Sequence, residues 1–131
     1  MQEDHLTELV RRNNISEIIV HLDKDINQVN GRGDSVLLIA TRLNYRSLVD
    51  QLINLGADIN HENHRGTSAL TLAIFNGFFE MARDLWISGA KVVRPSDKEA
   101  DSSNLVHTMT YKQNLRTLEE QARKEATDTI R

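Results

Sequence analysis

The chain has 131 residues, of which 39% are hydrophobic and 27% charged, the size and composition of one folded domain. It contains no cysteine, which excludes disulfide bonds, thiolate metal sites and a cysteine nucleophile. The net charge of −3 is too small to indicate a nucleic-acid or membrane partner. No apolar run approaches the ~18 residues of a membrane span, and "MQEDHLTELVRR" is unlike a signal peptide. We therefore expect a cytoplasmic location.

Residues 1–24 have the apolar spacing of a terminal unit, with charged residues between the apolar ones. Five apolar positions match by type the positions 33 residues later: Leu6, Ile15, Ile19, Val20 and Leu22 match Ile39, Leu48, Leu52, Ile53 and Leu55. The end of a repeat array needs a polar outer face, which the charged residues would supply. We therefore predict an N-terminal capping repeat over 1–24.

The middle of the chain holds two copies of one unit. Residues 25–57 align with residues 58–90 without a gap, and twelve of the 33 aligned positions are identical. Internal identity at this period is the signature of a stacked repeat architecture. We therefore predict one repeat over 25–57 and a second over 58–90.

Each unit has the pattern turn, helix, turn, helix. A segment rich in Asp, Asn and Gly opens the unit and predicts a turn. "SVLLIATRLN" (35–44) and "YRSLVDQLINLG" (45–56) then carry apolar residues at helical spacing. Asn44, which aligns with Gly77, suits the left-handed residue that ends a first helix. One such helix pair cannot bury both of its faces, so neighbouring pairs must stack.

After residue 90 the pattern weakens. "RPSDKEADSSN" (94–104) is polar and contains the one proline of the chain, so it predicts a loop. "NLVHTMTYKQ" (104–113) and "LRTLEEQARKEATDT" (115–129) predict two further helices. Their leucines keep the 33-residue register, which indicates a degenerate C-terminal capping repeat over 91–122, followed by a frayed tail over 123–131.

These residues resemble the ankyrin repeat. "LGADINHENHRGTSALTLAIFNGFFEMARDL" (55–85) is similar to the family pattern of a Gly-Ala-Asp-(Val/Ile)-Asn turn, then Gly-x-Thr-Pro-Leu-His and Leu-Ala-x-x-x-Gly. The resemblance implies an all-α fold, an ankyrin-repeat solenoid of stacked antiparallel helix pairs with short hairpin turns and about three to four repeats including the caps. The Pro and His of the pattern are absent from both units, which have Ser35-Val36-Leu37-Leu38 and Ser68-Ala69-Leu70-Thr71.

The resemblance implies a non-catalytic protein–protein interaction module with no cofactor. In the family, variable positions of the concave face, made of turn tips and first helices, bind partner proteins. Carried over by position, the partner-binding residues are Val29, Arg32, Asp34, Arg42, Leu43, Glu62, His64, Arg65, Thr67, Phe75 and Asn76. Phe75 is the expected apolar anchor, and the three arginines favour a partner with an acidic surface. Such a module would act by occupying its partner, as an inhibitor, an immunity protein or an adaptor, and we expect a monomer or a weak oligomer.

Two motifs suggest other functions. His61 and His64 could serve a metal-dependent enzyme or a metal-binding protein, but their i,i+3 spacing differs from the i,i+4 pair of a zinc-protease helix, and a stable site needs three or four ligands. Arg32-Gly33-Asp34 is the tripeptide that integrins bind in adhesion proteins, but its Arg and Gly recur in the next unit as repeat residues. We therefore predict exposed turn residues at both places.

Overall fold

The computed structural model describes residues 4–22, 25–98 and 104–130. Within these ranges the chain forms seven α-helices, two short 3₁₀ helices and no β-strand, so the all-α prediction is confirmed. In chain order the elements are α1 (His5–Arg11), α2 (Ile15–Leu22), α3 (Val36–Arg42), α4 (Arg46–Asn54), α5 (Ala69–Phe75), α6 (Phe79–Ile87), η1 (Pro95–Asp97), η2 (Leu105–His107) and α7 (Met109–Ile130).

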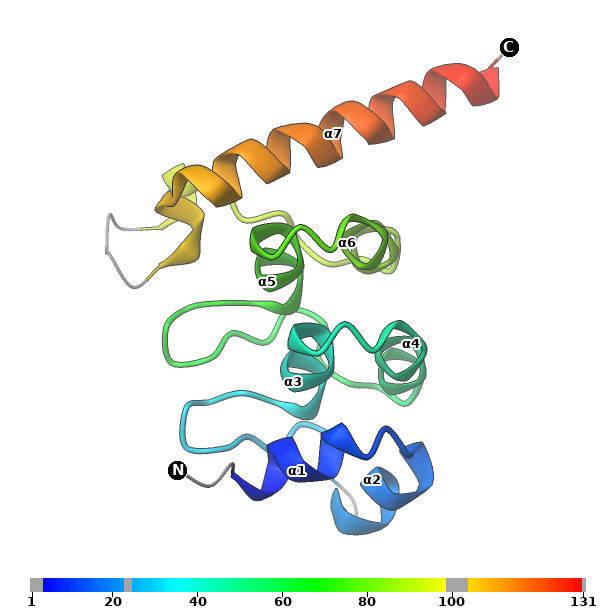
Figure 1. Cartoon of the computed structure of the whole chain (residues 1–131), viewed down its shortest axis with the longest axis vertical. Helices are drawn as coiled ribbons and strands as arrows, with labels where there is room; N and C mark the ends of the chain where they lie inside the picture. Colours follow the sequence, from blue (N-terminus) through cyan, green and yellow to red (C-terminus); the bar gives the residue numbers. More distant parts are fainter. Residues whose placement is uncertain (1–3, 23–24, 99–103, 131) are drawn as a thin grey trace.

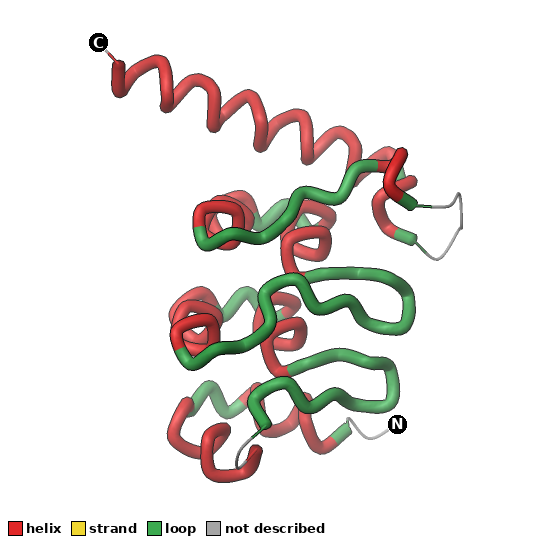
Figure 2. The backbone as a smooth tube through the Cα atoms, turned by 180° about the vertical axis from the view of Figure 1, so that it is seen from behind, coloured by secondary structure: helices red, strands yellow, loops and turns green. Residues whose placement is uncertain are grey.

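The first six helices form three antiparallel pairs that stack in one direction (Figure 1). The first helices of the pairs form an inner row, in which α3 packs between α1 and α5. The second helices form an outer row, in which α4 packs on α2. Seen from behind, the connections that lead into α3 and α5 extend away from the helices as two long loops, one above the other (Figure 2). The predicted solenoid is therefore confirmed.

Local chemistry explains where the inner helices begin and end. Ser35 Oγ accepts a hydrogen bond from a backbone N–H of the first turn of α3 at 3.3 Å, and Ser68 Oγ accepts the equivalent bond in α5 at 3.3 Å. A cap of this kind stabilises a helix by about 1 kcal/mol. Asn44 (φ 60°) and Gly77 (φ 74°) take the predicted left-handed conformation just after α3 and α5.

The core lies between the two rows of helices. Residues 36–41 of α3 and 69–74 of α5 are all buried. The outer helices bury one face each, because their apolar residues recur at spacings of three and four. Leu52 and Leu85, the same position of successive units, are both 0% exposed, as their register predicts.

The N-terminal pair is less polar on its outer side than the sequence predicted. Ile18 and Leu22, four residues apart, form the buried face of α2. Ile19 and Val20 therefore point to other sides of the helix, and they are 42% and 76% exposed. The charged outer face predicted for residues 1–24 is thus interrupted along α2.

The C-terminal segment forms the short 3₁₀ helix η2 and one long α-helix, where the sequence predicted two helices over 104–113 and 115–129. α7 runs from Met109 to Ile130 without a break. It contains no glycine or proline, so nothing ends a first helix near Asn114. α7 extends into the segment 123–131 that the sequence predicted as a frayed tail, and residue 131 lies outside the described ranges.

α7 closes one end of the stack (Figure 1). Its buried side chains, Tyr111, Leu115 and Leu118, follow helical spacing, and α7 packs on α5. The loop predicted over 94–104 contains η1, and its residues 99–103 lie outside the described ranges. None of the described helices combines the length and the apolar composition that a membrane crossing requires.

Candidate functional site

Two long loops, residues 25–35 and 58–68, extend from the stack one above the other (Figure 2). We use the name hairpin face for these loops together with residues 42–43 and 75–76, where α3 and α5 end; Arg42 is joined to the first loop through its ion pair with Asp34. An antiparallel bridge joins Val29 to Ser35 across the first loop, which is therefore a hairpin. All eleven predicted partner-binding residues lie on these segments.

One asparagine closes each hairpin. Asn30 Oδ1 accepts hydrogen bonds from the backbone N–H groups of Arg32 and Asp34, both at 3.0 Å. Asn63 Oδ1 accepts the equivalent bonds, from the residues two and four positions on, at 3.0 and 3.1 Å. Because side-chain-to-backbone bonds of this kind hold tight turns, the same residues give both hairpins the same shape.

Two histidines join the second hairpin to the first. His64 N donates to Arg32 O at 3.1 Å, and His61 Nε2 donates to Gly33 O at 2.7 Å. Because the Nε2–H of His61 is used in this bond, only Nδ1 of that ring keeps a lone pair. The described residues also contain no group of three metal-binding side chains. His61 is half-buried, so its prediction as an exposed turn residue is wrong; His64 is exposed.

Asp34 is the buried centre of the first hairpin. Its carboxylate accepts a hydrogen bond from Asn63 Nδ2 at 2.9 Å and lies 3.1 Å from Arg42 Nη2 and 3.3 Å from Arg32 Nε. Burial by itself raises the pKa of the Asp34 carboxyl, but the bond from Asn63 and the charge of Arg42 outweigh burial and lower that pKa. The charged carboxylate therefore links both hairpins to the end of α3.

The predicted partner-binding residues differ in exposure. Leu43 and Phe75 are half-buried, whereas Asp34 is 0% and Thr67 4% exposed. Asp34 and Thr67 each directly precede the serine that caps an inner helix, and they turn inward there, so the structure removes both from the surface that a partner can reach. The exposed members are Val29, Arg32, Arg42, Glu62, His64, Arg65 and Asn76.

Burial of Asp34 also bears on the Arg32-Gly33-Asp34 tripeptide. A receptor that recognises this sequence must contact the aspartate carboxylate. That carboxylate is inaccessible and already bonded to three side chains, so the hairpin does not present the tripeptide for adhesion.

The arginines of the hairpin face are largely neutralised. Arg32 lies 3.1 Å from Asp4 and also pairs with Asp34, and Arg42 pairs with the same Asp34. Within the described residues, Arg65 has no ion-pair partner. The positive charge that predicted an acidic partner is therefore concentrated at Arg65.

Two residues of α7 that the sequence analysis did not single out shape one end of the hairpin face. Asn114 Nδ2 donates to Ile74 O at 2.8 Å and to Phe75 O at 3.2 Å, which fixes the end of α5 against α7. Tyr111 donates its hydroxyl to Val93 O, and burial raises the pKa of Tyr111 to about 12. The sequence signal for Asn114 was a polar residue between apolar positions of a helix, which does not by itself identify a partner.

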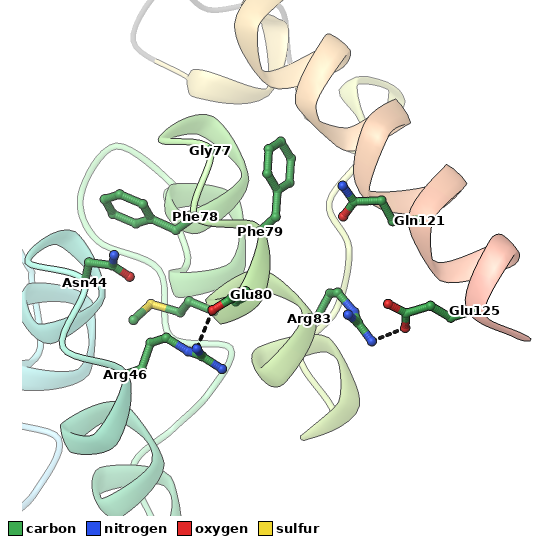
Figure 3. A pocket seen from close by; sticks show the side chains of 10 residues that line it. Asn44, Arg46, Gly77, Phe78, Phe79, Glu80, Arg83, Gln121 and Glu125 are labelled. Atoms are coloured by element: carbon green, nitrogen blue, oxygen red, sulfur yellow. Dashed lines mark hydrogen bonds and ion pairs between the residues drawn. The ribbon is translucent and has the colours of Figure 1, made fainter.

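A pocket of about 550 Å³ lies where the turns before α4 and α6 approach α7 (Figure 3). Phe78, Phe79 and Gln121 line it together with four charged side chains. Those four are paired with each other: Arg46 Nη1 lies 2.5 Å from Glu80, and Arg83 pairs with Glu125. None of the predicted partner-binding residues lines this pocket.

A family model described as ankyrin repeats, in three copies, matches residues 6–96. The match covers more than half of the chain and includes all three helix pairs and both hairpins. No curated protein matches the chain.

Proposed function

Because this chain belongs to the ankyrin-repeat family, we propose that it is a non-catalytic protein-binding module whose partner lies against the hairpin face. Ankyrin repeats generally bind other proteins. Exposure is the observation that carries the proposal: seven of the eleven predicted residues are exposed, and all seven lie on the hairpin face.

The hairpin face suits binding because hydrogen bonds within it hold its shape. Asn30 and Asn63 close the two hairpins, and Asp34 joins them. A surface that is already ordered loses less conformational entropy when it binds, so more of the contact energy appears as affinity.

Phe75 supplies the apolar contact and Arg65 the charge. Phe75 lies half-buried at the end of α5, where it packs against the core and keeps part of its ring accessible. Aromatic side chains seated in this way are frequent binding hot spots. Arg65 is exposed and has no ion-pair partner among the described residues, so it favours an acidic group on the partner protein.

A module without a catalytic site acts by occupying its partner. The roles consistent with this are an inhibitor, an immunity protein or an adaptor, and we propose that it works in the cytoplasm as a monomer or a weak oligomer.

The test is affinity purification of the tagged chain from its own cells, followed by titration of the purified partner with variants. Phe75→Ala should weaken binding by about 2 kcal/mol or more, as hot-spot truncations do. Arg65→Gln should mainly slow association and reduce its dependence on salt.

The matched control is Asp50→Asn, a charge change at an exposed position of α4 in the outer row. Circular dichroism of each variant checks folding, because Phe75 also contacts the core. Full affinity in Phe75→Ala and Arg65→Gln, with loss in Asp50→Asn, would move the interface to the outer helices and contradict the proposal.

A further inference from the structure

We propose that Asn30 is a self-modification site, at which the backbone nitrogen of Gly31 attacks the side-chain amide and converts residue 30 to aspartate or isoaspartate. The inference does not depend on the proposed function. It starts from the sequence, which contains two Asn-Gly pairs, Asn30–Gly31 and Asn76–Gly77. Asparagine is among the thermolabile residues, and a following glycine leaves the attacking nitrogen unhindered by a side chain.

The hairpin polarises the amide that is attacked. Asn30 Oδ1 accepts two backbone hydrogen bonds, from Arg32 N and Asp34 N, both at 3.0 Å. When a nitrogen adds to Cγ, negative charge develops on Oδ1, and two fixed N–H donors at this oxygen stabilise that charge. The bonds that close the first hairpin thus also favour the tetrahedral intermediate.

The attacking nitrogen is accessible. Gly31 is exposed, no atom lies within 4 Å of the place where a Cβ would stand, and its N–H makes no hydrogen bond with the described residues. Water or a buffer base can therefore take the proton from this amide, which must leave before the nitrogen can attack.

In the part of the chain that the structure describes, Asn63 lacks the free attacking amide, and Asn76 lacks both that amide and the two donors to its side-chain oxygen. Asn63 has the same pair of donors, but the next N–H, of His64, donates to Arg32 O at 3.1 Å. At Asn76 the N–H of Gly77 donates to a carbonyl of α5 at 3.1 Å, and no described N–H donates to the Asn76 Oδ1. Native structure therefore ranks Asn30 first.

The reaction balances without an oxidant or a cofactor. The bond from Gly31 N to Asn30 Cγ forms, the bond from Cγ to Nδ2 breaks, and the displaced proton leaves with ammonia through water. The product is a cyclic imide, which water hydrolyses at either carbonyl to aspartate or isoaspartate.

The modification changes the contact between the hairpin and the N-terminal unit. Asn30 Nδ2 donates to Asp4 Oδ2 at 3.2 Å. Both products lose this donor with the ammonia. In the aspartate product a carboxylate takes its place opposite the Asp4 carboxylate, and like charges at this distance repel; in the isoaspartate product Cγ becomes part of the backbone. Asp4 also caps α1, so ageing of residue 30 acts on the first helix of the stack.

The test incubates the full chain in mildly alkaline buffer, digests samples over time, and measures aspartate and isoaspartate at positions 30, 63 and 76 by mass spectrometry. In the folded protein, Asn30 should react at least about tenfold faster than Asn63 or Asn76. The reasons are that the N–H of Gly31 makes no hydrogen bond with the described residues that must first break, and that two N–H donors stabilise the charge that develops on Asn30 Oδ1. In urea the Asn30 and Asn76 rates should converge, because only their shared Asn-Gly sequence remains.

Two variants separate geometry from sequence. Gly31→Ala has open space for its methyl group and should keep the fold while removing most of the product at position 30. His64→Gly creates a third Asn-Gly pair whose N–H still bonds to Arg32 O, so Asn63 should remain slower than Asn30. The proposal is overturned if the folded chain shows no product at position 30, if Asn76 reacts as fast as Asn30, or if Asn63 in His64→Gly matches Asn30.

Discussion

Gly33→Ala should destabilise the protein more than any other glycine substitution in the hairpins, because two separate costs meet there. Gly33 has φ 81°, a left-handed conformation that side chains disfavour. A Cβ at this position would lie 2.6 Å from His64 Cδ2 and 3.0 Å from the His64 backbone nitrogen. The ring can rotate away, but the backbone nitrogen is held by its bond to Arg32 O.

The magnitude follows from these two parts. The left-handed conformation costs an alanine about 1–2 kcal/mol, and the close contact adds about 1–3 kcal/mol, as overpacking usually does. Gly66→Ala isolates the first part, since Gly66 has φ 74° but its nearest Cβ contact is an ordinary 3.5 Å. Gly31→Ala has neither cost, and its free energy of unfolding should stay within about 0.5 kcal/mol of the parent value or rise slightly.

The assay is urea denaturation followed by circular dichroism, with the free energy of unfolding extrapolated to water for the parent and the three variants. Gly33→Ala should lose the most stability, Gly66→Ala an intermediate amount and Gly31→Ala almost none. Adding His64→Ala to Gly33→Ala should restore only the part due to the ring. Equal losses in Gly33→Ala and Gly66→Ala would show that the two hairpins do not touch at this point, and would refute the reasoning.

Three further changes test the core, the hairpin contact and the buried acid by the same denaturation assay. Leu85→Ala should cost about 2–5 kcal/mol, whereas Ile87→Ala, at a side chain 79% exposed, should change little; the reverse order would contradict the core assignment. His61→Ala should cost about 1 kcal/mol through the lost bond to Gly33 O, and no loss would mean that this bond adds nothing in solution. Because the pKa of Asp34 is lowered in the folded protein, its carboxylate should contribute fully to the free energy of unfolding above its unfolded pKa of about 3.9. That contribution should be lost as the pH falls through the folded pKa. If Asp34→Asn lost stability with falling pH in the same way as the parent, the charged Asp34 would not be stabilising the fold.

The repeat period by itself determined which positions of the two middle repeats are equivalent, whereas in the N-terminal unit Ile19 and Val20 are exposed although their match Leu52 is buried and their match Ile53 half-buried. Asn30 and Asn63 close matching hairpins, and Leu52 and Leu85 are buried alike. The physical reason is that caps, tight turns and the apolar stripe of a helix depend on residues close together in the chain. Where the chemistry is local, a recurring sequence produces a recurring structure.

Only the tertiary structure decided which charges remain free and how the stack ends. The sequence predicts Asp34 as a surface residue, whereas in the structure its carboxylate is buried and accepts a hydrogen bond from Asn63, 29 positions later. α7 has the composition to continue as one helix, yet its contact with the end of α5 depends on Asn114 reaching carbonyls about 40 positions earlier. Such bonds join residues that share no periodic relation, so their effect on exposure and charge is set by packing and cannot be obtained from a repeating pattern.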